Sequence, residues 1–274
     1  MKNFLATLAL LFALIAPALA LDLYVAPPPP NGNGDNTNNN CQRQASPCAT
    51  GQHAVDQIPL LNAGVGYDIY FASNCQPGPC AYPGAISISF WKVVNLRGSC
   101  ANLTAASLRP SADNQTIVYA QDGAIVGVNC LELNSGGFAN VGGLGGRQYS
   151  ILDFRWVYFT NIAVGISIAT STASCTGPVY VNGGSMSVFA AASNNGFLNM
   201  PCLMTLLNGP TISYFAKVGY RSTISFGGGS ISGGVSGGSQ YAIVDGTLDA
   251  GGNALPGSFP CNVAGSGTVW GLPQ

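Results

Sequence analysis

Charged side chains are scarce in this chain of 274 residues: Asp, Glu, Lys and Arg make up 7% of it, and histidine occurs once. Soluble proteins usually carry about 25% charged residues, so solubility here has to come from Asn, Ser, Thr, Gln and Gly. Nine basic and ten acidic residues leave a formal net charge of −1. Because no basic stripe exists to neutralise phosphates, we expect no nucleic-acid partner.

Long apolar runs are missing after the first twenty residues. The opening MKNFLATLALLFALIAPALA places Lys2 before an apolar run from Phe4 to Ile15 and ends in Ala-Leu-Ala. This order is typical of a secretory signal peptide, and the run is shorter than the ~20 residues that span a bilayer. We expect cleavage before Leu21, secretion to the extracellular space or periplasm, and no membrane insertion after cleavage.

Metal-binding cysteine pairs are missing as well. No Cys-x-x-Cys occurs and His53 is the single histidine, so the sequence predicts no structural metal. All nine cysteines follow the leader, which suits disulfides in an oxidising compartment. The expected pairs are two local loop staples, Cys41 with Cys48 and Cys75 with Cys80, and two longer bridges, Cys175 with Cys202 and Cys100 with Cys130.

The longer bridges depend on a repeat in the sequence. Cys175 and Cys202 are 27 residues apart, about one repeat, and stacked strands lie ~4.8 Å apart, within reach of a disulfide. Cys100 and Cys130 fall about two residues out of register when the repeats are aligned. Cys261 is left without an assigned partner.

The repeat is a phrase of alternating apolar residues, broken once at a bend. Its clearest copies are VGVNCLEL (126–133) and LDFRWVYF (152–159), with looser copies at Val94, Val179, Ile224 and Ala242. Period-two alternation indicates strands, and recurrence every roughly 18 to 27 residues indicates stacked coils. Antiparallel folds need hairpin turns at shorter intervals, and no helical segments lie between the repeated strands to form βαβ crossovers. We therefore predict an all-β parallel β-helix.

The chain divides into four predicted parts. Residues 1–20 are the signal peptide, 21–64 hold a strand, an Asn/Gly-rich loop and a capping helix, 65–250 form the β-helix, and 251–274 form a C-terminal tail or cap. The helix is expected in GQHAVDQIPLL, after the N-cap residue Thr50 and limited by Pro59. It would cover the open end of the first coil. We interpret GGLGG (142–146) as a turn.

Several segments resemble a known superfamily. LYVAP, GNGDN, CQRQASPCATGQHAVDQ, ILDFRWVYFTNIAVGISI and the closing GSQYAIVDGTLDAGGNALPG look like secreted right-handed parallel β-helix proteins of the pectate-lyase-like superfamily, including uncharacterised, tail-spike-like members. The resemblance covers nearly all of the chain after the leader. It implies a right-handed, three-faced helix with polysaccharide sites on outer faces or in grooves, and it leaves the chemistry open.

Catalytic residues of that superfamily have only partial counterparts here. Pectate lyases hold calcium with several carboxylates and use an arginine base, so calcium is expected only if this chain is a lyase. Hydrolysis by two carboxylates needs a separation of ~5 to 9.5 Å. Glu132 and Asp153, on neighbouring coils, are the candidate pair, with Arg155 as a third candidate.

Outward polar and aromatic residues suggest binding instead. Alignment of the phrases predicts one column formed by Arg97, Asn129, Arg155 and Asn182. Tyr158 and Tyr180 are expected beside it, where aromatic faces would stack on sugar rings. Alternative interpretations are a purely structural ladder, a surface ion pair between Asp153 and Arg155, and a corner role for Trp156.

We therefore expect a secreted β-helix protein, monomeric or homotrimeric, that binds an extracellular or cell-surface polysaccharide. One alternative is a polysaccharide lyase or glycoside hydrolase. The other is a structural or adhesive surface protein.

Overall fold

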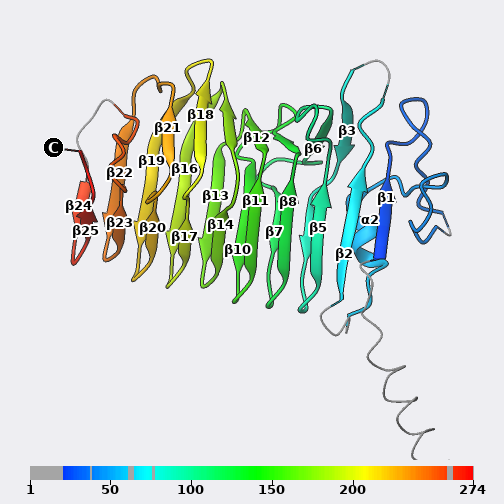
Figure 1. Ribbon diagram of the computed structural model, residues 1–274, viewed down its shortest axis with the longest axis horizontal. Helices are drawn as coiled ribbons and strands as arrows, with labels where there is room; N and C mark the ends of the chain where they lie inside the picture. Colours follow the sequence, from blue (N-terminus) through cyan, green and yellow to red (C-terminus); the bar gives the residue numbers. More distant parts are fainter. Residues whose placement is uncertain (1–20, 38, 61–64, 76–77, 258–261, 274) are drawn as a thin grey trace, which may run out of the picture.

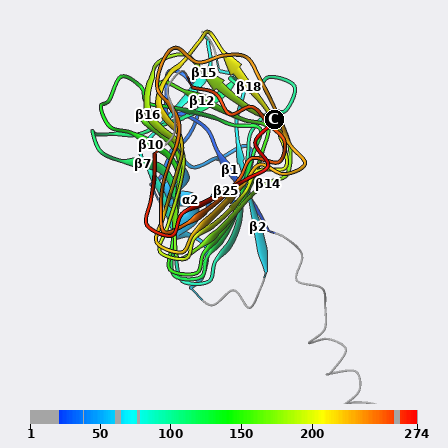
Figure 2. The ribbon, with the colours of Figure 1, turned by 90° about the vertical axis from the view of Figure 1, so that its left-hand side faces the viewer.

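The protein is a parallel β-solenoid of about seven turns (Figure 1). The computed structural model describes residues 21–37, 39–60, 65–75, 78–257 and 262–273, so the expected signal peptide and Cys261 lie outside the described residues. Viewed along the solenoid, successive coils superimpose (Figure 2). The fold class predicted from the period-two alternation is confirmed. None of the described helices is long and apolar enough to cross a membrane.

Three parallel sheets form the faces of the solenoid. Sheet 1 contains, in spatial order, β1 (Leu21–Val25), β2 (Gly66–Phe71), β5 (Val93–Arg97), β8 (Ile125–Asn129), β11 (Ile151–Arg155), β14 (Thr172–Cys175), β17 (Phe197–Asn199), β20 (Thr223–Ser225), β23 (Thr247–Asp249) and β25 (Thr268–Trp270). Sheet 2 contains β3 (Cys80–Pro83), β6 (Ala106–Arg109), β9 (Glu132–Asn134), β12 (Val157–Thr160), β15 (Val179–Asn182), β18 (Leu203–Leu207) and β21 (Ser230–Ser232). Sheet 3 contains β4 (Ile86–Ile88), β7 (Thr116–Ala120), β10 (Gly142–Arg147), β13 (Val164–Ala169), β16 (Ser185–Ser193), β19 (Thr211–Gly219), β22 (Ser239–Val244) and β24 (Asn262–Ala264).

Each coil visits the sheets in the order 1, 2, 3, so residues one coil apart become neighbours. Register partners on sheet 1 are 21 residues apart for Leu152 and Ala173, and 32 apart for Leu96 and Val128. The coils therefore vary more in length than the repeat spacing predicts. Extra residues enter between the strands, and the strand register itself is unchanged.

The core is a continuous apolar column inside the coils. Four phenylalanines link the three sheets across the interior: Phe159 on sheet 2, Phe189 and Phe215 on sheet 3, and Phe226 after β20 of sheet 1. Successive ring centroids lie 6.1, 5.2 and 5.5 Å apart, distances at which aromatic rings attract one another. All four side chains are fully buried. Alternation along each strand places these rings inward and leaves the polar residues outside.

A short helix, α2 (Gly51–Asp56), packs against the first coils. Thr50 is its N-cap, as predicted, because its hydroxyl accepts a hydrogen bond from the amide of His53. Ala54 and Val55 are buried, and the Lys92 ammonium donates to the Val55 carbonyl at 3.0 Å. The role of this helix as an end cap remains a prediction.

The segment GGLGG is a strand, β10, and the predicted turn is wrong. A Cβ atom on Gly145 would lie 2.7 Å from the Tyr119 ring, and one on Gly143 would lie 2.7 Å from the Phe159 ring. Glycine is needed here because large rings of neighbouring strands occupy the side-chain space. The strand ladder also extends beyond the expected limits of 65 and 250, since β1 pairs with β2 and β24 and β25 continue sheets 3 and 1.

All four expected disulfides are present, namely Cys41–Cys48, Cys75–Cys80, Cys100–Cys130 and Cys175–Cys202. The bridge between Cys175 and Cys202 joins adjacent coils, with Cα atoms 5.8 Å apart. The predicted two-residue offset between Cys100 and Cys130 is confirmed, because Arg97 pairs with Asn129 and the position opposite Cys130 is therefore Gly98. The chain after Arg97 nevertheless turns back far enough to bring the Cα atoms of Cys100 and Cys130 to 4.7 Å.

The phenylalanine core can be tested by truncation. Phe189→Ala should lower the free energy of unfolding by about 3–5 kcal/mol, because the ring contacts two others and its removal leaves a cavity. A urea titration followed by circular dichroism measures this change. Phe138→Ala, at a residue that is 39% exposed, is the control and should change stability little. Equal effects of the two substitutions would contradict the packing described.

Candidate functional site

One outward ladder of polar and aromatic side chains follows the carboxyl ends of the strands in sheet 1. It consists, on five successive strands, of Tyr24, Tyr70, Arg97, Asn129 and Arg155. Strict register places one of these side chains on each coil, ~4.8 Å from the next. They line the corner where sheet 1 turns into sheet 2, which we call the 1–2 corner.

Two stacked tyrosines begin the ladder. The rings of Tyr24 and Tyr70 lie 5.7 Å apart with an interplanar angle of 21°. The Tyr70 hydroxyl donates to Asp68 at 3.4 Å, a long hydrogen bond. Burial, followed by the negative charges of Asp22 and Asp68, raises the pKa of Tyr70. The Tyr70 ring therefore stays neutral at ordinary pH.

Arg97 is held by Asp68 on the neighbouring strand. Its Nε lies 3.0 Å from Asp68 Oδ1, which makes an ion pair, although this Nε forms no hydrogen bond. Asn95 donates to the same carboxylate oxygen at 2.8 Å. The pair is partly exposed, with 33% of the Arg97 side chain accessible, so its contribution to stability is at most about 1 kcal/mol. Its main effect is to fix the position of the guanidinium.

Arg155 is held in a similar way by Asn129, to which its Nε donates at 2.6 Å. The next residue, Trp156, forms the bend with a positive φ of 54° and is 39% exposed. A Cβ atom on Gly177 would lie 2.8 Å from Arg155 Cβ and 3.6 Å from the Trp156 indole nitrogen. Glycine at 177 therefore lets the next coil approach both side chains closely.

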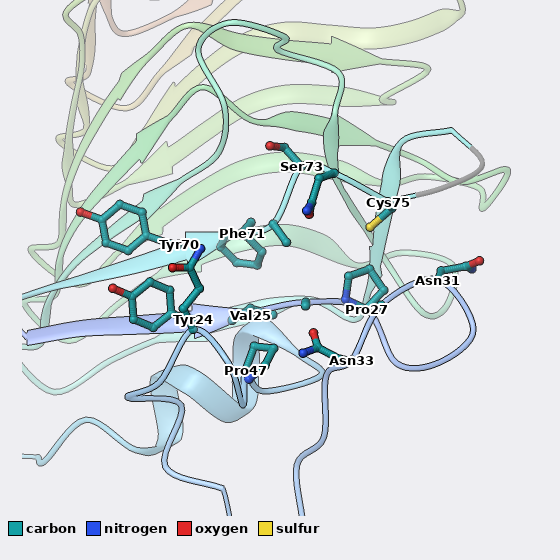
Figure 3. Close-up of a pocket in the computed structure, with 15 residues that line it drawn as sticks. Tyr24, Val25, Pro27, Asn31, Asn33, Pro47, Tyr70, Phe71, Ser73 and Cys75 are labelled. Atoms are coloured by element: carbon teal, nitrogen blue, oxygen red, sulfur yellow. The ribbon is translucent and has the colours of Figure 1, made fainter.

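Two cavities meet at this ladder. One, of about 240 Å³, is lined by Tyr70, Arg97, Gly98, Cys100, Asn129, Cys130, Arg155 and Trp156. The other, of about 630 Å³, shares Tyr70 and lies at the N-terminal end of the solenoid (Figure 3). Figure 3 shows Tyr24 and Tyr70 side by side on one side of this cavity, with Asn31 and Asn33 on the other. We call the two cavities together the 1–2 groove.

Disulfides and an ordered loop form the walls of the 1–2 groove. The Cys100–Cys130 bridge borders the smaller cavity and Cys75 borders the larger one. Asn31, Gly32 and Asn33 of the Asn/Gly-rich loop form a further wall. The loop is held in place by Asn39, which donates to the carbonyls of Asp35, Ser46 and Pro47. The site is therefore fixed by covalent bonds and by side-chain hydrogen bonds to the backbone.

Asn182 does not belong to the predicted column. It lies on β15 of sheet 2, in register with Thr160, whereas Arg97, Asn129 and Arg155 lie on sheet 1. The repeated phrase covers two strands and a bend, and the copy at Val179 matches the second strand of LDFRWVYF, not the first. Asn182 instead accepts a hydrogen bond from Asn208 at 2.6 Å.

Tyr158 and Tyr180 also lie on sheet 2, stacked with ring centroids 5.5 Å apart. Glu132 precedes Tyr158 in the same outward column and is 6% exposed. Burial, the charge of Glu132 and the neighbouring Tyr180 raise the pKa of Tyr158. These three residues form a face separate from the 1–2 groove.

The candidate catalytic carboxylates lie on different sheets. Glu132 is on β9 of sheet 2, where the Thr160 hydroxyl donates to it at 2.7 Å. Asp153 is on β11 of sheet 1, where the Thr176 hydroxyl donates to it at 2.8 Å. The two outward faces diverge at the 1–2 corner, and Arg155 bonds to Asn129, so the alternative ion pair with Asp153 is not formed. Among the described residues the ion pair of this face joins Asp68 to Arg97.

Sequence reasoning missed Tyr24 and Tyr70. A signal was present, since Asp22-Leu23-Tyr24 and Asp68-Ile69-Tyr70 repeat one pattern. The two triplets are in register on β1 and β2. Alignment of these strands with the later phrases would have extended the column towards the N-terminus.

Potential metal ligands in the described part of the chain gather at Cys41, Cys48 and His53. The two sulfur atoms are joined in a disulfide, so they are not available as thiolates.

No family model matches the chain, and no curated protein or solved structure is detectably similar to it. The fold and the geometry of the 1–2 groove therefore carry the functional argument.

The environment of Tyr70 predicts its titration. Its native pKa lies above the unfolded value of about 10. The stabilisation linked to the neutral phenol is therefore complete below pH ~10 and is lost as the pH rises through the native pKa. A difference titration of tyrosinate absorbance between wild type and Tyr70→Phe should show a group that ionises above pH 10. A difference curve centred at or below pH 10 would contradict this.

Proposed function

We propose that the protein binds an extracellular or cell-surface polysaccharide that carries carboxylate or sulfate groups, and that the 1–2 groove is its binding site. The observation that carries this proposal is the state of two guanidinium groups. Arg97 faces Asp68 through its Nε, and Arg155 donates through its Nε to Asn129. Their terminal nitrogens have no protein partner among the described residues.

Free terminal nitrogens of a fixed guanidinium suit anions that present two oxygen atoms side by side. Carboxylate, sulfate and phosphate oxygens accept two parallel hydrogen bonds from one arginine, and these charged bonds are stronger than neutral ones. Arg97 and Arg155 are two coils apart, hence about 10 Å along the solenoid. A polymer with regularly spaced acidic sugars, lying along the axis, would meet both.

Aromatic side chains favour a sugar over a simple anion. The Tyr24–Tyr70 stack lies at one end of the groove and Trp156 at the other. The face of an aromatic ring is electron-rich and attracts the polarised C–H bonds of a sugar ring. Asn129, between the two arginines in register, adds an amide suited to hydroxyl groups.

Arg155→Ala should weaken binding to polygalacturonate by about tenfold or more, because a charged hydrogen bond contributes ~1.5–3 kcal/mol. Isothermal titration calorimetry at low ionic strength measures the change, and added salt should weaken wild-type binding because it screens exposed charges. Dextran sulfate and uncharged dextran extend the comparison to sulfated and neutral chains. Circular dichroism verifies that the variant is folded.

The matched control is Lys217→Ala, an exposed cation on β19 of sheet 3, outside the groove. It removes the same charge and should leave affinity almost unchanged. Equal losses for both substitutions would indicate a general charge effect and contradict a site at the 1–2 groove. Absence of binding to both acidic polymers would overturn the proposal.

The alternative functions predict different results. A lyase or hydrolase would release new chain ends from the polymer, and Asp153→Ala or Glu132→Gln would abolish that release. A structural or adhesive protein would self-associate in analytical ultracentrifugation and bind neither polymer.

A further inference from the structure

The opposite edge of sheet 1 carries a second set of exposed aromatic side chains. Sheet 3 turns into sheet 1 through the row of narrow tips along the lower edge of Figure 1, which we call the 3–1 corner. Backbone bonds stack these tips: Trp91 N donates to Asp122 O at 3.1 Å, and Tyr149 N donates to Thr170 O at 2.7 Å. The corner therefore continues the ladder of the sheets.

Positive φ angles are a general feature of this corner. Asp122, Asn194 and Asp245 have φ between 51° and 53°, a region that Asn and Asp tolerate better than most residues. Three coils instead carry a large aromatic residue in this conformation. Trp91, Tyr149 and Tyr220 have φ of 58°, 63° and 48°. Aromatic residues, unlike Asn and Asp, have no local hydrogen bond that stabilises a positive φ.

These aromatic side chains also face water. Trp91 is 72% exposed, Tyr149 76% and Tyr220 63%. Three further exposed apolar side chains start the adjacent strands of sheet 1, and they are Ile125, Ile151 and Phe197. Ile125 and Ile151 are in register. The six residues follow the 3–1 corner along the solenoid, with Thr172 between Ile151 and Phe197 in register, and we call them the aromatic ridge.

One ring of the ridge is fixed by its packing. A Cβ atom on Gly123 would lie 2.6 to 2.7 Å from three atoms of the Trp91 indole. The indole therefore lies against the backbone of the next coil while its other face remains exposed. A ring held in this way loses little conformational freedom when a ligand stacks on it.

Polar groups lie at the C-terminal end of the ridge. A cavity of about 410 Å³ is lined by Asn194, Asn195, Tyr220, Arg221, Asp245 and Ser266. Asp245 Oδ1 accepts hydrogen bonds from the backbone amide and the hydroxyl of Ser266. These two bonds, that from the amide first, lower the pKa of Asp245. Within the described residues the side chains of Asn194, Asn195 and Arg221 have no hydrogen-bond partner in the protein. Donors and acceptors thus surround one exposed aromatic ring.

We propose that the aromatic ridge is a second binding site, separate from the 1–2 groove, for an uncharged linear polysaccharide that lies along the solenoid axis. The two sites lie at opposite ends of the strands of sheet 1, and the strands they share are β5, β8 and β11. Trp91 and Tyr149 are two coils apart and Tyr149 and Tyr220 three, hence about 10 and 14 Å along the axis. An extended chain would meet all three rings, whereas a single small molecule would not.

An uncharged chain fits the chemistry of the ridge. Arg221 and Asp245 bring opposite charges to the same cavity, so the site has no net attraction for an anion or a cation. Hydroxyl groups both donate and accept, and they can use Arg221, Asp245 and the two asparagine amides together. Apolar ring faces of the sugars would cover the exposed aromatic surface.

The test is affinity electrophoresis in gels that contain hydroxyethylcellulose, galactomannan or soluble amylose. We expect retardation of the wild-type protein by at least one of these polymers. Tyr149→Asn should weaken that binding roughly two- to tenfold, the range of one aromatic contact. Its thermal stability should be unchanged or higher, because Asn tolerates φ near 60° better than Tyr. Tyr149→Phe keeps the ring and should keep the binding.

Phe138→Ala removes an exposed aromatic ring outside the ridge and should change nothing. The two proposals can fail independently. Arg155→Ala should weaken binding to polygalacturonate only, and Tyr149→Asn should weaken binding to the neutral polymer only. Absence of retardation in all three gels, or equal retardation of wild type and Tyr149→Asn, would overturn the ridge proposal. If either variant lost binding to both polymers, the sites would not be separate, and the ridge proposal would also be overturned.

Discussion

In-register stacking of parallel strands is the constraint on which the rest of this structure depends. Each strand pairs with the strand one coil away, and the pairing places like positions of successive coils ~4.8 Å apart. Inward positions become the phenylalanine column, and outward positions become continuous ladders. The arginines of the 1–2 groove and the rings of the 3–1 corner are ordered by this single pairing rule.

Scarcity of charge gives the few ionic groups a clear structural role. Asp68 compensates part of the charge of Arg97, which stays a guanidinium, whereas Arg155 contacts only the neutral amide of Asn129. A surface with more charges would provide Arg155 with competing partners. The low charge of the chain therefore leaves the Arg155 guanidinium without an acidic partner among the described residues.

Period-two alternation was sufficient to predict the fold, the sheet 1 strands at Val126 and Leu152, and the bridge from Cys175 to Cys202. It was not sufficient to assign a strand to a sheet. The phrase contains two similar half-phrases, and Val179 was matched to the wrong half, which misplaced Asn182. Local pattern cannot distinguish two strands with the same alternation.

Other features depend on neighbours in space. Gly142 to Gly146 form a strand because they pair with β7 and β13, and glycine is needed there because Tyr119 and Phe159 fill the side-chain space. The positive φ of Trp91 and Tyr149 follows from the stacking of the tips, since neither side chain prefers that conformation. Sequence propensities predict the opposite in each case.

The uneven distribution of cross-links gives the solenoid a direction of unfolding. Coils of a solenoid contact only their neighbours, so stability is a sum of local terms. The disulfides of the described residues all lie at or before Cys202, and the strands β20, β21, β23, β24 and β25 have three residues each. On heating, the chain would unravel from its C-terminal end, coil by coil. The Tyr220 cavity would then be lost first, while the cross-linked coils around Arg97 and Asn129 still hold their shape.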